Sequence, residues 1–218
     1  MQDVNKPLRI GSMNVRGLAN NKKRLDVFDW LKGKNMDIYC LQDTHSDPIS
    51  EVEFADDWDG KCILNSNSSS SRGVAILLSS TLKAEIKALH IQSDGNLIMA
   101  YVSILDNFEF LLITLYGPNK DDPNFYLKLK ELLERETLPI IICGNWNLAQ
   151  NYHLDTFGYR HENNKSAQST VKQMTSVLDL TDPWRRGNMG IRKYTWFSSK
   201  APRQMARLDF FLVTPDIL

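Results

Sequence analysis

The chain alternates short apolar runs with polar turns, and this pattern predicts many strands and few helices. Apolar runs of about four to eight residues are typical of strands, whereas apolar residues at every third or fourth position are typical of amphipathic helices. On this basis we expect strands over residues 8–15, 37–42, 73–80, 83–92, 97–105, 108–116, 138–143, 194–198 and 207–214, with the last two paired. Helices are expected over residues 21–32, 124–136 and 169–178.

Many strands with three helices predict an α+β fold in which two sheets pack face to face and the helices lie outside. A length of 218 residues suits one domain of ordinary size. There is no internal repeat and no linker. The serine run at 66–71 is long enough for a loop but too short for a domain boundary. We therefore expect residues 1–218 to form a single domain.

Composition narrows the functional classes. Charged residues make up 24% and hydrophobic residues 42%, as in soluble globular proteins, and Lys+Arg 26 balances Asp+Glu 26. Basic residues prevail only in residues 151–218, which hold 10 basic and 6 acidic side chains. Cys40, Cys62 and Cys143 form no close pair, which argues against a disulfide scaffold or a zinc site. Neither a signal peptide nor a membrane span is expected.

Candidate chemistry gathers where the predicted strands end. Polar residues at the ends of several strands can converge on one rim of the molecule. Six short motifs have this placement: Ser12–Gly17 (SMNVRG), Leu41–His45 (LQDTH), Leu115–Asn119 (LYGPN), Gly144–Asn147 (GNWN), Tyr194–Trp196 (YTW) and Arg207–Phe211 (RLDFF). Each motif alone is weak evidence, but six in this order across residues 8–214 are strong evidence.

Together the motifs resemble those of the endonuclease/exonuclease/phosphatase superfamily, and most of all the endonuclease domain of LINE-type non-LTR retrotransposons. The resemblance implies a DNase I-like fold and an enzyme that depends on Mg²⁺, with Mn²⁺ as a substitute. It implies a monomer that nicks one strand of double-stranded DNA, leaving a 3′-hydroxyl for a reverse transcriptase domain of the same polyprotein. Such a protein is made in the cytoplasm and acts on chromosomal DNA in the nucleus.

The resemblance also assigns roles to catalytic residues. Asp43 stands where the family usually has Glu and is the expected main metal ligand, with Asn14 helping to hold the metal or the phosphate. Tyr116 is expected to donate its hydroxyl to the phosphate, and Asn147 to orient the nucleophile or a phosphate oxygen. Asp209 is the residue that, in the family, hydrogen-bonds a catalytic histidine.

Two departures from the family pattern predict an impaired enzyme. Asn145 occupies the place of an Asp that handles the attacking water, and an amide keeps the carboxylate's shape without its charge or basicity. The closing Ser-Asp-His motif is missing from a chain that ends at Leu218. We expect a further strand to exist in the natural protein, because its loss opens a sheet edge. His45 is interpreted as a surface or DNA-side residue.

DNA contacts are expected mainly from a hairpin loop at 198–206. In the family this loop reaches into the minor groove, and here it carries Ser198, Lys200 and Arg203. A second basic group, Arg185, Arg186, Arg192 and Lys193, is equally consistent with phosphate contact or with a solvated face. Arg16 and Thr195 complete the predicted DNA-binding set.

Two other functional hypotheses remain open at this stage. One is a catalytically dead DNA-binding module, which Asn145 favours. The other is a different phosphoesterase of the superfamily that acts on abasic DNA, phosphoinositides or sphingomyelin. A lipid-directed enzyme would show apolar membrane loops or a signal peptide, and neither is visible in the sequence.

Overall fold

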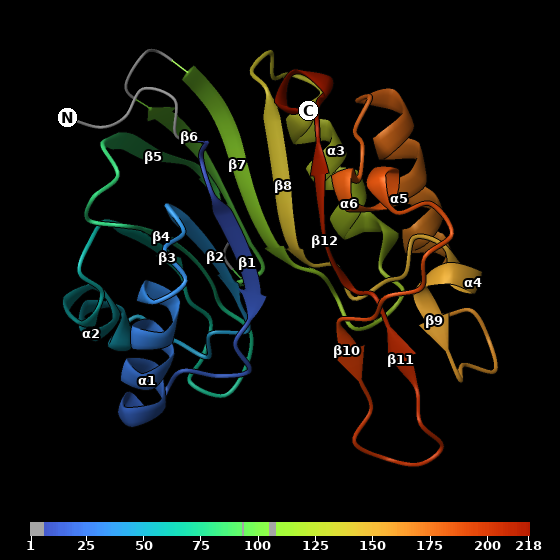
Figure 1. Cartoon of the computed structure of the whole chain (residues 1–218), viewed down its shortest axis with the longest axis horizontal. Helices are drawn as coiled ribbons and strands as arrows, with labels where there is room; N and C mark the ends of the chain where they lie inside the picture. Colours follow the sequence, from blue (N-terminus) through green and yellow to red (C-terminus); the bar gives the residue numbers. More distant parts are fainter. Residues whose placement is uncertain (1–6, 93, 105–107) are drawn as a thin grey trace.

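The protein folds into four layers: helices, a sheet, a second sheet and further helices (Figure 1). The structure is a computed structural model that describes residues 7–92, 94–104 and 108–218. The two sheets pack face to face with the longer helices outside, so the predicted α+β architecture is confirmed. No helix among these described residues is long and apolar enough to cross a membrane.

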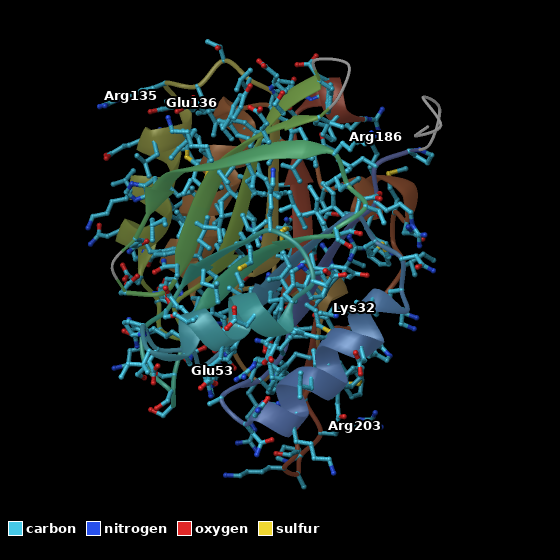
Figure 2. The ribbon with its side chains drawn as sticks, turned by 90° about the vertical axis from the view of Figure 1, so that its left-hand side faces the viewer. Lys32, Glu53, Arg135, Glu136, Arg186 and Arg203 are labelled. Carbon is cyan, nitrogen blue, oxygen red and sulfur yellow. The ribbon has the colours of Figure 1, made fainter. Side chains whose placement is uncertain are left out.

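The first sheet has the strand order β1-β2-β4-β3. Its members are β1 (Ile10–Asn14), β2 (Ile38–Gln42), β4 (Val74–Leu78) and β3 (Cys62–Asn65). Every residue of β2 and β4 is buried, as their continuous apolar runs predict. The helices α1 (Asn21–Lys32) and α2 (Ser50–Asp57) lie against the outer face (Figure 2).

The second sheet has the strand order β12-β8-β7-β6-β5. These strands are β12 (Asp209–Val213), β8 (Ile140–Asn145), β7 (Phe108–Tyr116), β6 (Leu97–Ile104) and β5 (Ala84–Ile91). β7 and β8 are parallel, and the connection between them runs through α3 (Pro123–Leu133). α3 and α5 (Lys165–Val177) cover the outer face of this sheet.

The space between the sheets is filled by apolar side chains from β2, β4, β6, β7 and β8. Polar links cross it as well: Asn65 Nδ2 of β3 donates to the Leu97 carbonyl of β6 at 2.8 Å, and Gln42 Nε2 donates to Thr114 Oγ1 at 3.0 Å, with Gln42 and Thr114 fully buried. A buried amide left unpaired is costly, so these bonds favour one relative placement of the two sheets.

A small third sheet, ordered β10-β11-β9, corrects one prediction. Strands β10 (Trp196–Phe197), β11 (Met205–Ala206) and β9 (Thr156–Phe157) are short. The two late strands were expected to pair with each other. Instead β10 pairs with β11, and β12 pairs antiparallel with β8. The apolar residues of β12 are buried by joining the large sheet, whereas β10 and β11 are two residues long and contain a single buried residue, Ala206.

Other elements were misplaced or missed in the sequence. α5 begins at Lys165, four residues before its predicted start, because Asp121 from a distant loop accepts hydrogen bonds from Ser166 N and Ala167 N. α3 ends at Leu133 rather than at residue 136. Six elements were not predicted: α2, β3, α4 (Tyr152–Asp155), β9, α6 (Pro183–Gly187) and β11, which lies within the expected hairpin loop. A short turn, η1 (Pro215–Ile217), follows β12. The predicted turn at 106–107 lies outside the described residues.

Candidate active site

The predicted catalytic residues lie on one rim, where β1, β2, β7 and β8 end and β12 begins. In the first sheet, Asn14 at the end of β1 is opposite Gln42, so Asp43 is the next residue along the neighbouring strand. In the second sheet, Tyr116 is opposite Asn145, and Asn145 is opposite Asp209. Neighbouring strands lie about 4.8 Å apart, so each set is close together.

Asp43 begins a tight loop after β2. It has a positive φ of 60°, and its carbonyl accepts a hydrogen bond from Gly17 N at 2.7 Å. Its carboxylate Oδ1 lies 3.0 Å from His45 Nε2. His45 was interpreted from the sequence as a surface or DNA-side residue; its side chain is partly exposed and its ring also contacts Asp43. Asn14 Oδ1 accepts a hydrogen bond from Arg16 N at 3.0 Å.

Tyr116 faces the Asp43 carboxylate from the second sheet. Burial and the negative charge of Asp43 raise the pKa of the Tyr116 hydroxyl, and the neighbouring amides of Asn119 and Asn147 offset this only in part. The hydroxyl therefore keeps its proton at neutral pH and remains a hydrogen-bond donor. The first sheet thus contributes an acceptor, the Asp43 carboxylate, and the second sheet a donor, the Tyr116 hydroxyl, to the same part of the rim.

The turn after β8 places two amide side chains. Asn145 is 6% exposed, and its Oδ1 accepts a hydrogen bond from Asn147 N at 2.9 Å. Asn147 Nδ2 in turn donates to the Gly117 carbonyl at 2.6 Å. Between them Trp146 is fully buried and stacks on Phe210 with ring centroids 4.8 Å apart. The indole therefore anchors the turn to the core and fixes both amides at the rim.

Glycine is required where this turn meets β7. A Cβ on Gly117 would lie 2.3 Å from the Trp146 carbonyl oxygen and from the Tyr126 hydroxyl, and one on Gly144 would lie 2.0 Å from the Leu115 carbonyl oxygen. The hydroxyl of Tyr126 donates to the same Trp146 carbonyl. The glycines of the two motifs thus permit the close backbone approach that brings Tyr116 beside Asn145.

Asp209 is a partly buried carboxylate with an unfilled hydrogen-bonding capacity. Its Oδ1 is buried and has no hydrogen-bond partner among the described residues. Burial raises the pKa of the Asp209 carboxyl, while the Thr195 hydroxyl and the charge of Arg16 lower it in part. Thr195 Oγ1 also accepts hydrogen bonds from Leu208 N and Asp209 N. Thr195 therefore holds the start of β12 at the rim.

The predicted DNA-binding residues separate into exposed and internal groups. Arg16, Lys200, Arg203 and Arg192 are exposed. Figure 2 shows Arg203 at one end of the molecule and Arg186 near the other. Ser198 uses its hydroxyl within the hairpin, where it donates to the Lys200 carbonyl and accepts from Gln204 N.

Arg185 is turned inward, which contradicts its predicted phosphate contact. Its Nη2 donates to Asp155 Oδ1 at 2.5 Å, and its Nη1 donates to the carbonyls of Asn188 and Ile191. Phosphate binding would have to break an ion pair with an aspartate that is 1% exposed. Arg185 therefore belongs to the interior.

Arg207 joins the same buried cluster, which was not predicted. Its Nε donates to Asp155 Oδ1 at 2.9 Å and its Nη2 to Asp182 Oδ2 at 2.7 Å. The cluster ties the start of β12 to α4 and α6, two residues before Asp209. The one sequence signal for a buried Arg207 is that it begins an apolar strand motif. Its partners Asp155 and Asp182 lie 52 and 25 residues away, so no local pattern identifies them.

Two cavities flank the rim and share Asn119. The first, about 430 Å³, lies between Asn147 and the small third sheet and includes Trp196 and Tyr159. The second, about 600 Å³, extends from Asp43 and Tyr116 to the cations Arg72, Lys120 and Lys128. The second cavity therefore brings three cations to the same hollow as the Asp43–Tyr116 pair.

The donor set at the rim fits a hard divalent cation with an open coordination shell. Asp43 supplies a carboxylate and Asn14 an amide oxygen, and Mg²⁺ commonly binds through one or two carboxylates together with water and phosphate. No group of three His, Cys, Asp or Glu residues that could hold a metal occurs in the described part of the chain. The buried Oδ1 of Asp209, which has no hydrogen-bond partner among the described residues, is a further acceptor at this rim.

Comparison with known proteins identifies the class. Residues 11–218 match the Endonuclease/Exonuclease/phosphatase family, and the chain belongs to that family. The fold is similar to the AP endonuclease LMAP from Leishmania major, with a TM-score of 0.75, 14% identity, and 94% and 78% of the two chains covered. An AP endonuclease from Archaeoglobus fulgidus gives a TM-score of 0.72, 20% identity, and coverage of 96% and 88%.

Among curated proteins, the chain is similar to the transposon TX1 uncharacterized 149 kDa protein of Xenopus laevis. The two sequences are 24% identical over 194 residues, which is 87% of this chain and 14% of that protein. The superfamily resemblance inferred from the six motifs is confirmed.

Proposed function

We propose that the chain is the endonuclease domain of a LINE-type retrotransposon, that it binds double-stranded DNA, and that Asn145 keeps its nicking activity low. The observation that carries this proposal is the single rim where Asn14, Asp43, Tyr116, Asn145 and Asp209 converge from two sheets. The similarity to a transposon protein supports the LINE assignment. A nuclear site of action and a reverse transcriptase domain in the same polyprotein follow from that assignment.

Asp43 and Asn14 would hold a Mg²⁺ ion, or Mn²⁺ in its place. When bound, the ion would neutralise phosphate charge and polarise a phosphoryl oxygen. Tyr116, a retained donor, would hydrogen-bond a non-bridging oxygen of the scissile phosphate, and Asn147 would orient the same group. These residues would bind and orient the phosphodiester.

Asn145 would lie beside the attacking water without being able to accept its proton. A neutral amide has no useful basicity at neutral pH, whereas a carboxylate there acts as an acid–base group. The chain would therefore keep the shape of the active site and lack one chemical function. This proposal accounts for a rim that brings Asn14, Asp43, Tyr116 and Asp209 together around an amide at position 145.

Exposed cations support the proposal that DNA binds along the rim. Lys200 and Arg203 lie on the hairpin between β10 and β11, and Arg16 lies next to Asn14. Arg192 lies three residues before Thr195, which directly precedes β10. These four would contact phosphates or the minor groove, with the scissile phosphate at Tyr116.

The test is a comparison of the chain with its Asn145→Asp variant on supercoiled plasmid in Mg²⁺. Nicking should rise by about 10²–10⁴-fold, the usual contribution of a positioned acid–base group. Asn151→Asp is the matched control, because it adds the same charge at the N-cap of α4, where Asp caps equally well. DNA binding should change little in either variant.

Equal and negligible nicking by both variants, with DNA binding intact, would favour the second candidate, a DNA-binding module without catalysis. The observation that favours this candidate is Asn145 itself. No DNA binding by any variant would contradict both candidates.

A further inference from the structure

A histidine in the loop after β2 contacts the candidate metal ligand of the same loop. His45 Nε2 lies 3.0 Å from Asp43 Oδ1, and the two side chains are 27% and 16% exposed. An ionised carboxylate only accepts hydrogen bonds, so Nε2 carries the proton in this pair. The bond occupies one oxygen of the carboxylate and leaves the other for a ligand.

The backbone of this loop is held from both sides. Gly17 N donates to the Asp43 carbonyl at 2.7 Å, and His45 N donates to the Arg72 carbonyl at 2.8 Å. Asp43 and His45 both have positive φ, 60° and 53°, a costly conformation for non-glycine residues that persists only where the surroundings impose it. The loop is therefore a fixed support that aims both side chains.

Gly17 leaves the space that the imidazole occupies. A Cβ at this position would lie 2.8 Å from His45 Nδ1 and 3.3 Å from its Cγ. The ring thus packs directly on the backbone that follows β1, the strand that ends in Asn14. The imidazole is consequently confined between the two segments that supply the candidate metal ligands.

We infer that His45 is a positioning residue that orients the Asp43 carboxylate for a divalent cation. This inference rests on the proposed function. Asp43 has one rotatable bond fewer than a glutamate, and its reach is shorter, so its carboxylate plane must be set accurately for the free oxygen to serve as a ligand. A hydrogen bond from a confined ring sets that plane, as outer partners do at other metal sites. His45 touches neither phosphate nor water in this role.

The test is Mn²⁺ binding to the DNA-free chain, measured by titration calorimetry on four variants. His45→Ala should lower the affinity by roughly 10-fold, the lower end of the effect of removing such a partner. His45→Gln carries an N–H donor at the position of Nε2 and should retain most of the affinity. His45→Asn carries its donor at the position of Nδ1, falls short of Asp43, and should behave like His45→Ala. His153→Ala removes an exposed histidine of α4 and should have no effect.

Equal Mn²⁺ affinity across the series would overturn the inference, and so would a His45→Gln variant as weak as His45→Ala when both melt at the wild-type temperature. An Asp43→Ala variant that binds Mn²⁺ as the wild type does would overturn it as well, because the bound ion would then be elsewhere. A different result would contradict the proposed function: an Asn145→Asp variant that neither binds nor nicks DNA. That result does not depend on the Mn²⁺ affinities of the His45 variants.

Discussion

Asn145 and Asp209 stand opposite each other on β8 and β12, and this pairing shapes the electrostatics of the rim. Two carboxylates so close would each disfavour ionisation of the other. With an amide at 145, Asp209 is spared that repulsion, and the remaining cause of its raised pKa is chiefly burial. An Asp at 145 would therefore bring an added charge that a bound cation is suited to offset.

Asp209→Asn should stabilise the protein at neutral pH and lower any nicking activity. Because the folded-state pKa of Asp209 is raised, protonation favours the folded state below the ordinary value of 3.8, and this stabilisation is lost as pH rises through the folded-state value. The ionised carboxylate thus weakens the fold at neutral pH, and Asn removes that cost. The melting temperature should rise by roughly 1–3 °C at pH 7.

The same variant should melt like the wild type below about pH 3.8, where Asp209 is protonated in both states. Thermal melting of the two proteins from pH 3 to pH 8 measures the difference. A constant gain at all pH values would show that the carboxylate's charge is not the cause.

At the scale of elements, the buried ion cluster fixes β12 against α4 and α6. Arg207 is 4% exposed and pairs with Asp155 and Asp182, which are 1% and 4% exposed. Arg207→Ala should lower the free energy of unfolding by about 3–5 kcal/mol, because it leaves carboxylates buried without their partner. Lys130→Ala breaks the more exposed pair with Glu134 and should cost about 0.5 kcal/mol or less.

Chemical denaturation of the two variants provides the comparison. Similar losses for Arg207→Ala and Lys130→Ala would mean that Asp155 and Asp182 relax into water when the arginine is removed.

The hairpin between β10 and β11 projects from the body on the side of the rim (Figure 1). Replacing Lys200 and Arg203 by Ala in the Asn145→Asp protein should weaken DNA binding and reduce its salt dependence by up to two phosphate contacts. The pattern of nicks along a plasmid should also shift. The double variant Lys83→Ala, Lys87→Ala removes two exposed cations near and on β5, at the opposite edge of the second sheet, and is the matched control.

DNA binding measured at several salt concentrations, together with mapping of the nicks, shows whether the hairpin contacts DNA or is a solvated turn. If both double variants behave alike, the hairpin tip is a solvated turn and target choice lies elsewhere, with Arg192 and Lys193 as the next candidates.

The sequence predicted elements whose signals are local. The sequence predicted β7 at its observed bounds, and β2 and β4 to within two residues, because long apolar runs are buried as strands between two packed sheets. The rim residues were predicted to meet because strand ends share an edge of each sheet. Other features depend on partners that are distant in the sequence and were not predicted. The start of α5 depends on Asp121, and the inward orientation of Arg185 depends on Asp155. The contact of His45 with Asp43 depends on a loop whose backbone is hydrogen-bonded to Gly17 and Arg72.

At the scale of the whole molecule, the rim is divided between two sheets. Asn14 and Asp43 belong to the first sheet, and Tyr116, Asn145 and Asp209 to the second. Their relative placement therefore depends on how the sheets pack. The buried bond from Gln42 to Thr114 joins a rim strand of the first sheet, β2, to a rim strand of the second, β7.

Thr114→Val should reduce the free energy of unfolding by about 1–2 kcal/mol, because one bond to the buried Gln42 amide is lost. Gln42 keeps its hydrogen bond to the Cys40 carbonyl, which limits the loss. In the Asn145→Asp background the same change should lower nicking more than DNA binding, since it alters the register between the two halves of the rim.

Thr175→Val is the control for this change, because Thr175 donates only to carbonyls within its own helix, α5, and its loss should cost about 0.5 kcal/mol or less. Denaturation and plasmid nicking measure the two effects. Equal effects of the two substitutions would show that the sheets keep their relative placement without the Gln42–Thr114 bond.

The hairpin tip is closed by its own atoms, since the Ser198 hydroxyl bonds the Lys200 carbonyl and Gln204 N, and residues 199–203 are exposed. Its sequence can therefore change during evolution with little effect on folding. The rim, by contrast, is tied into both sheets and tolerates few replacements. A lineage of such proteins is free to diversify at the tip while its chemistry stays the same, and an engineer who wished to exchange one surface loop for another would begin at Ser199.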